Sequence, residues 1–157
     1  MYPIEKSLKD YLDYLEIEKN RSPKTRENYE RYLKAFINFS KIKKPEDITS
    51  ENIKDFRAHL ARKENLKKIT QTYYAIAIRN FLKYLIKNDY EVLSPDKIEL
   101  PKIPRRQIDI IEYADLERFL SAPAQNTLRG LRDRAILEMF FSTGLRISEI
   151  WNLDRYI

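Results

Sequence analysis

Four residues, Thr-Gly-Leu-Arg at 143–146, have types and an order suited to binding a phosphate group. The glycine is expected to end one helix just before another begins, which places Arg146 in the first turn of the new helix at a sharp bend. The planar guanidinium of an arginine can donate two parallel hydrogen bonds to a phosphate, and Glu149, one turn later, is spaced to orient it. A purely structural interpretation also fits, in which Arg146 forms an ion pair with Glu149 or Asp133.

Other common chemistries are poorly supported by the composition. The chain has no cysteine and a single histidine, His59, so disulfides, thiolate metal sites, histidine zinc clusters and a Ser-His triad are excluded. Its two glycines, Gly130 and Gly144, fit neither a Walker loop nor a dinucleotide fingerprint. We therefore expect no metal, no cofactor and no small-molecule substrate.

The net charge of +6 is unevenly distributed along the chain. Residues 1–107 carry 24 Lys+Arg against 16 Asp+Glu, a net +8, whereas residues 108–157 carry 6 against 8, a net −2. A basic helical unit favours a polyanion partner, most often nucleic acid, because neutralising phosphates releases counterions. A lysine-rich solvated surface without a partner is the alternative.

No part of the sequence indicates a membrane or export. No stretch approaches the roughly 18 apolar residues of a membrane span, and residues 1–20 are too charged for a signal peptide. We expect a cytoplasmic protein with no membrane partner.

Apolar residues at helical spacing predict four helices in the basic part. Ser22-Pro23 is a strong helix start, Lys44-Pro45 is a break, and Thr49 or Ser50 can cap the third helix. Tyr73 and Tyr74 are expected in the core. The expected helices cover residues 4–19, 23–40, 50–63 and 70–88, with Phe36, Phe56 and Phe81 buried between them.

The remainder of the chain differs in pattern. Prolines interrupt residues 93–106, which suits a linker, and helices are expected at about 114–121 and from about 128. Residues 135–141 are apolar nearly all round and should be buried, although fifty residues cannot supply all the neighbours. This second domain is therefore expected to be incomplete or covered by another chain. The predicted organisation is a helical domain at 1–92, a basic linker at 93–107 and a second domain at 108–157.

Residues 131–150 resemble the box of the tyrosine recombinases, the phage integrase and Xer-like family, that carries the first catalytic arginine. Many members have Arg-Asp, an apolar run, Thr-Gly-Leu-Arg, a β-branched residue and Ser-Glu-Leu. Here the box begins at Arg132-Asp133 and ends at Ser148-Glu149, and Arg146 matches the catalytic arginine.

The resemblance extends over essentially the whole chain. The family's helical core-binding domain, called SAM-like, has a Ser-x-x-Thr-x-x-x-Tyr-x-x-x-Leu pattern, and a Leu-Pro-Lys linker follows its last helix. That last helix usually contains an Arg-x-Phe-x-x-Tyr-like stretch. The matching residues here are Ser22, Thr25, Tyr29 and Leu33 for the first pattern, Arg79, Phe81 and Tyr84 for the last helix, and Leu100-Pro101-Lys102 for the linker. Glu112 departs from the pattern, because a capping threonine is expected before the next helix.

The resemblance implies a mainly α protein: a four-helix SAM-like core-binding bundle, then the truncated helical start of a catalytic domain. It implies transesterification on double-stranded DNA, in which a tyrosine attacks the scissile phosphate and forms a 3′-phosphotyrosine without metal or ATP. Arg146 would stabilise the phosphorane. The family's later catalytic boxes do not occur in these residues, and Tyr156 lies too close to Arg146 to be the nucleophile. This chain is therefore expected to bind DNA and not to cut it.

The resemblance also places the second and fourth helices in the major groove. Other protomers on the same DNA are implied as partners. The candidate DNA-binding residues are Lys24, Thr25, Arg26, Lys67, Lys68, Thr70, Gln71, Arg79, Lys83, Lys102, Arg105 and Arg106.

Two other functions stay open. One is a short, naturally non-cleaving DNA-binding protein with an architectural or inhibitory role. The other is a helical protein-interaction module whose basic surface is incidental, which predicts no DNA affinity at moderate salt.

Overall fold

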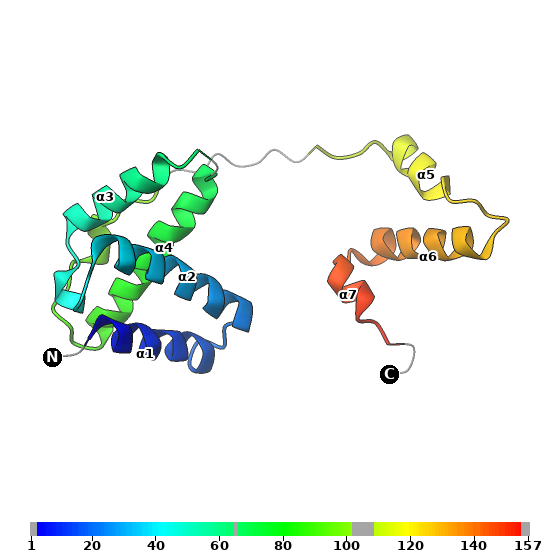
Figure 1. Ribbon diagram of the computed structural model, residues 1–157. Coiled ribbons are helices and arrows are strands. Elements are labelled where there is room, and N and C mark those ends of the chain that lie inside the picture. Colours follow the sequence, from blue (N-terminus) through cyan, green and yellow to red (C-terminus); the bar gives the residue numbers. More distant parts are fainter. Residues whose placement is uncertain (1–2, 65, 102–108, 155–157) are drawn as a thin grey trace. The chain divides into compact units, whose positions relative to one another are not determined.

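The structure, a computed structural model, describes residues 3–64, 66–101 and 109–154. These residues form seven α-helices and two short 3-10 helices, and none of them lies in a strand (Figure 1). The chain divides into two compact units, Met1–Pro104 and Arg105–Ile157. The predicted mainly α fold is confirmed.

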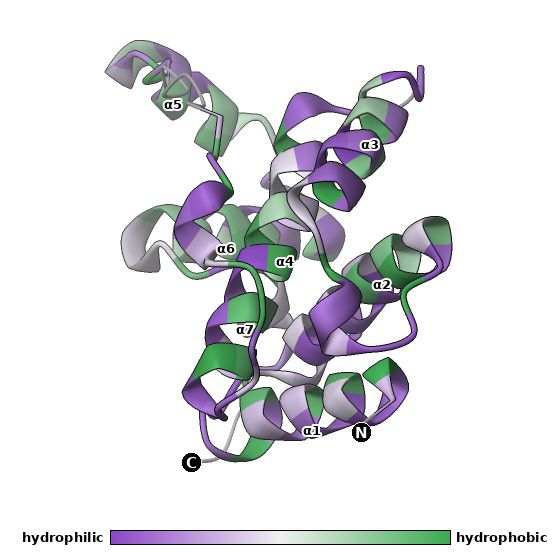
Figure 2. Cartoon of the chain, turned by 90° about the vertical axis from the view of Figure 1, so that its left-hand side faces the viewer, coloured by the Kyte–Doolittle hydropathy of each residue, from purple (hydrophilic) through white to green (hydrophobic). Residues whose placement is uncertain are grey.

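The first unit is a four-helix bundle. Helices α2 and α4 pack against each other, and each also contacts α1 and α3. Both hydrophobic and hydrophilic residues occur along α1 and α2 (Figure 2), and the buried residues of each helix recur at three- and four-residue spacing, as expected for helices that are buried on one side. The elements are α1 (Ile4–Ile17), α2 (Pro23–Ser40), the 3-10 helix η1 (Pro45–Asp47), α3 (Ser50–Ala61), α4 (Lys68–Lys87) and the 3-10 helix η2 (Pro95–Lys97).

Aromatic side chains from all four helices fill the centre of the bundle. Phe36 of α2 lies 5.4 Å from Phe56 of α3, and Tyr11 of α1 lies 5.2 Å from Phe81 of α4, between ring centroids. All four side chains are buried. The three phenylalanines were predicted to be core residues, which is confirmed.

Local capping explains where α2 and α3 begin. The Ser22 hydroxyl accepts a hydrogen bond from the Thr25 backbone N–H at 3.3 Å, and Pro23 occupies the first helical position, where its missing N–H costs nothing. Thr49 and Asn52 cap α3 reciprocally, each side chain accepting from the other's backbone N–H. Both starts were predicted from these residues.

Helix α4 differs from its prediction in two respects. It begins at Lys68 and not at Thr70, so one more half-turn is helical. Tyr73 is 45% exposed, so its predicted core position is wrong, whereas Tyr74 packs against the core. The reason is angular: the buried stripe of α4 runs through Ala75, Ile78 and Leu82, and Tyr73 lies outside it.

The segment after α4 packs back onto the bundle. Helix η2 contacts α4, and both Pro95 and Ile98 are buried. The sequence pattern suggested a linker from residue 93, because prolines usually interrupt regular structure. Here the proline begins a short 3-10 turn whose apolar residues complete the core.

The second unit contains α5 (Tyr113–Ser121), α6 (Leu128–Thr143) and α7 (Ile147–Trp151), with α5 packed on α6. Glu112, the residue that departs from the family pattern, precedes α5 and makes no side-chain capping bond. Gly130 is the only buried residue described in these helices, and a Cβ there would lie 1.7 Å from the Ala124 carbonyl oxygen. Glycine is therefore required where the preceding loop crosses α6.

The described residues of this unit cover α6 only in part. Hydrophobic residues occur along α6 and α7 (Figure 2), and Ile136, Met139 and Phe141 remain exposed. The described residues of this unit therefore do not bury residues 135–141 in the way that the sequence pattern predicts. The side chains of Ile136, Met139 and Phe141 form an exposed apolar surface on the second unit.

Candidate nucleic-acid interface

The first turn of α2 carries three of the candidate DNA-binding residues. Lys24 is exposed and forms a 2.6 Å ion pair with Glu27, one turn later on the same helix. Thr25 shares a 3.0 Å hydrogen bond between its hydroxyl and that of Ser22. Because the Lys24 pair is exposed, it is weak and a phosphate can replace it.

Arg26 is held differently from Lys24. Its guanidinium lies 3.3 Å from Asp13, 3.0 Å from Glu16 and 3.8 Å from Glu30. The first two carboxylates belong to α1, so this arginine joins α1 to α2. Three carboxylates compensate its charge, which makes Arg26 the least available of the described candidates for a phosphate.

The start of α4 presents cations beside unsatisfied backbone N–H groups. Lys67 and Lys68 are exposed and form no ion pair within the described residues, and no side chain caps the helix. Gln71 is used internally, since its side-chain amide donates to the Leu66 carbonyl at 3.0 Å, and Thr70 is half-buried. A helix N-terminus with two unpaired lysines favours an anion.

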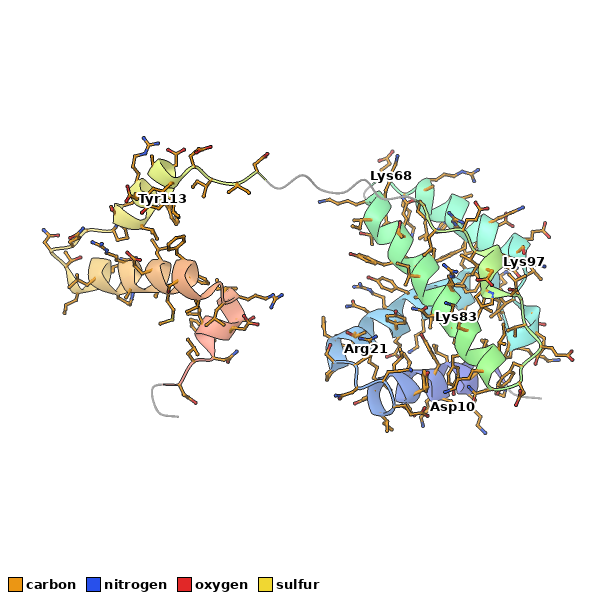
Figure 3. All side chains as sticks on the ribbon, turned by 180° about the vertical axis from the view of Figure 1, so that it is seen from behind. Asp10, Arg21, Lys68, Lys83, Lys97 and Tyr113 are labelled. Carbon is orange, nitrogen blue, oxygen red and sulfur yellow. The ribbon has the colours of Figure 1, made fainter. Side chains whose placement is uncertain are left out.

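Two further candidates lie along α4. Arg79 forms a 3.2 Å ion pair with Asp96 of η2, so it fixes η2 to the bundle. Lys83 is exposed and unpaired within the described residues, and Figure 3 shows it farther along the helix from Lys68. Three candidates, Lys102, Arg105 and Arg106, lie outside the described residues, as does Tyr156.

Arg146 lies at the bend between α6 and α7. Gly144 ends α6 with φ of 65°, a left-handed conformation that glycine adopts without strain, and Arg146 is the residue just before α7. The sequence prediction placed it one position later, in the first turn. The Arg146 side chain is 82% exposed.

Glu149 orients Arg146 from one turn away. Its carboxylate accepts from the Arg146 backbone N–H at 2.6 Å and from guanidinium Nη1 at 3.2 Å. Asp133 pairs instead with Arg132 and Arg129. In the described part of the chain, Nε and Nη2 of Arg146 have no partner, so an edge of the guanidinium fork can still donate to a phosphate.

The pKa of the Glu149 carboxyl is expected to lie below its usual range, because the Arg146 backbone N–H bonds its charged form and the guanidinium adds to this. Because the pKa of this carboxyl is lower in the folded than in the unfolded state, its ionised form stabilises the start of α7 at any pH above the unfolded-state pKa. This stabilisation is lost as the pH falls through the folded-state pKa.

An NMR titration of the Glu149 carboxyl, with a peptide of residues 144–154 as reference, measures the shift of its pKa. Arg146→Ala should restore only part of it, since the backbone N–H remains; a carboxyl that titrates as in the peptide would contradict this arrangement.

Sequence reasoning did not find a basic cleft between α1, α2 and α4. Its lining includes Lys19, Arg21 and Lys87 together with Lys83, which come from separated parts of the chain. Of these four cations, only Lys83 was a candidate from the sequence.

No membrane-spanning or metal-binding feature was found in the described ranges. None of their helices is both long enough and apolar enough to cross a membrane. They contain no group of three or more acidic, histidine or cysteine residues placed to hold a metal ion.

Residues 8–89, just over half of the chain, match the family described as phage integrase, N-terminal SAM-like domain. The chain belongs to this family. The match covers α2, α3 and α4 in full and most of α1, which are the helices of the bundle.

Relatives among the tyrosine recombinases match nearly the full length of this chain. It is 33% identical over 153 residues to tyrosine recombinase XerC of Natranaerobius thermophilus, covering 94% of this chain and 50% of the relative. It is 32% identical over 149 residues to tyrosine recombinase XerD of Listeria innocua, covering 92% and 50%. The chain thus spans about half the length of the curated relatives it matches.

A solved structure agrees with the sequence relatives. The crystal structure of XerA recombinase matches with a TM-score of 0.52 and 25% identity, over 97% of this chain and 51% of that one. The resemblance to the Xer tyrosine recombinases and the predicted SAM-like bundle are therefore both confirmed.

Proposed function

We propose that this chain is the DNA-binding part of a site-specific tyrosine recombinase. The observation that carries the proposal is the start of α4, where exposed Lys67 and Lys68 lie beside an uncapped helix N-terminus. Backbone phosphates fit such a site by charge and by hydrogen bonding. Membership of the phage integrase family and the tyrosine recombinase relatives support duplex DNA as the polyanion.

The proposal assigns a role to each unit. The bundle of α1–α4 is the core-binding domain and holds duplex DNA through the first turns of α2 and α4. The segment 93–107 connects it to the start of the catalytic domain, and η2 is the part of that segment that stays on the bundle. Other recombinase protomers on the same DNA are the proposed protein partners.

Arg146 is the proposed catalytic residue of this chain. In the assembled enzyme a tyrosine hydroxyl attacks the scissile phosphate, a phosphorus–oxygen bond to tyrosine forms, and the bond to the 5′-oxygen of the next nucleotide breaks. The Arg146 guanidinium donates to the phosphate oxygens as charge accumulates on them. No motif within residues 1–157 matches the one that carries the family's nucleophilic tyrosine. We therefore propose that these residues bind DNA without cutting it.

Removing two charges at the start of α4 tests the proposal. Lys67→Gln with Lys68→Gln is expected to weaken duplex binding roughly tenfold or more at about 100 mM salt, and to flatten the dependence of log affinity on log salt by about 2. Fluorescence anisotropy with a labelled duplex measures both quantities.

The matched control is Lys9→Gln with Lys54→Gln, which removes the same charge from exposed positions of α1 and α3. This pair should change duplex affinity much less. Equal losses in the two variants would mean that net charge alone attracts DNA, and the α4 interface would be refuted.

A further inference from the structure

The cleft between α1, α2 and α4 gathers cations, and none of the residues given for its lining is acidic, although Asp10 and Glu18 lie close enough to Tyr84 to influence its hydroxyl. It has a volume of about 590 Å³, within the range of small-molecule sites. None of the described residues that line it is aspartate or glutamate, and its four cations form no ion pair within the described part of the chain. These cations are Lys19, Arg21, Lys83 and Lys87. Arg26 and Arg79, outside the cleft, are by contrast paired with carboxylates.

Two of these cations converge on one tyrosine. The Lys19 ammonium lies 5.6 Å from the centroid of the Tyr14 ring, and the Lys87 ammonium lies 5.2 Å from it. Cation–π attraction holds both side chains there although their charges repel each other. An anion bound near the two ammonium groups would weaken that repulsion.

The rest of the lining is aromatic and offers partners for a planar ring. Tyrosines from three helices line the cleft: Tyr11 and Tyr14 of α1, Tyr29 of α2 and Tyr84 of α4. All but Tyr11 are only half-buried, so part of each remains accessible. Aromatic side chains beside a basic groove are the general means by which proteins hold unpaired bases.

Polar groups on the lining remain to be satisfied. The Tyr11 side chain is 1% exposed, and its hydroxyl has no hydrogen-bond partner among the residues that the structure describes. Asn80 donates its amide to the Tyr29 hydroxyl at 3.0 Å, which leaves its carbonyl oxygen able to accept from a base edge. A ligand that carries both donors and acceptors is therefore better suited than a simple anion.

We propose that this cleft binds one unpaired nucleotide, with its phosphate at Lys19 and Lys87 and its base against the tyrosines. The nucleotide is either free in solution or an unstacked position of a DNA strand. Only the second case rests on the proposed DNA-binding function.

The first test uses the whole chain with dAMP, deoxyribose 5-phosphate and inorganic phosphate, monitored by two-dimensional amide NMR. We expect dAMP to bind more tightly than the other two and to shift the signals of Tyr14, Tyr84 and Lys87. Binding of phosphate as tight as that of dAMP would refute a base site. No response to any probe at millimolar concentration would refute the proposal for free nucleotides.

Charge removal locates the site. Lys19→Gln with Lys87→Gln is expected to weaken dAMP binding about tenfold or more, because each lost hydrogen bond to a charged group is a strong one. Lys9→Gln with Lys54→Gln, which changes no residue of the cleft, should leave it unchanged. Equal effects in the two variants would refute the assignment to this cleft.

A single-stranded 20-mer and its duplex separate this inference from the proposed function. The cleft variant should lose affinity for the single strand and retain most of its affinity for the duplex. Equal fold losses would mean that the cleft is only part of a general phosphate surface, which refutes the nucleotide site and leaves DNA binding intact. Nucleotide binding without any duplex binding would instead refute the proposed function and sustain the cleft.

Discussion

Raising the salt concentration from about 50 to 200 mM is expected to lower the affinity of this chain for random duplex DNA about a thousandfold, the loss typical of six or more phosphate contacts. The structure accounts for which contacts are available. Arg26 and Arg79 are half-buried and held in ion pairs with residues of other elements. The remaining candidate cations are exposed, Lys24 in a weak pair with Glu27, or lie outside the described residues. Those remaining cations are Lys24, Lys67, Lys68, Lys83, Lys102, Arg105 and Arg106.

Fluorescence anisotropy at several salt concentrations measures this loss. A steep dependence supports counterion release from DNA. An affinity that changes less than about tenfold over this range corresponds to one or two phosphate contacts and contradicts an interface of this size. Absence of binding at the lowest salt would mean either that the rest of the catalytic domain is needed to hold the duplex or that the chain is a protein-interaction module, and adding back that domain would separate the two.

Phe36→Ala is expected to lower the free energy of unfolding of the bundle by about 3–5 kcal/mol. Phe36 is fully buried, and its ring lies 5.4 Å from that of Phe56, so truncation leaves a cavity at the contact between α2 and α3. Hydrogen exchange of the α2 and α4 amides measures the loss in the bundle separately from the second unit.

Phe39→Ala is the matched control, because it removes the same atoms from the same helix. Phe39 is 40% exposed, although its ring also lies 5.4 Å from Phe56. Its loss should therefore be much smaller, about 1 kcal/mol. Similar losses for the two substitutions would contradict the placement of Phe36 at the centre of the core.

Most of the helices could be predicted because their signals are local. Ser22-Pro23 and Thr49 mark helix starts through hydrogen bonds within three residues, so neither depends on the rest of the fold. The position of Arg146 near Glu149 was also predictable, since the two are separated by a single turn.

Long-range contacts decided the rest of the candidate site. The sequence could not reveal that Arg26 meets carboxylates of α1, or that Arg79 meets Asp96, because these ion pairs depend on how the helices pack. Tyr73 was wrongly placed for the same kind of reason. Its helix was correct, but which side of that helix faces the core is set by its neighbours.

By itself the sequence determined the helical elements, their caps, the basic first part and the family motif around Arg146, because each rests on residue type and short spacing. Only the tertiary structure decided which cations remain available to an anion. It paired Arg26 and Arg79 with carboxylates and brought Lys19 and Lys87 to the same tyrosine ring. The physical reason is that a cation remains available to an anion only when no carboxylate lies close to it. The distances between side chains of different helices are in turn fixed by packing of the core.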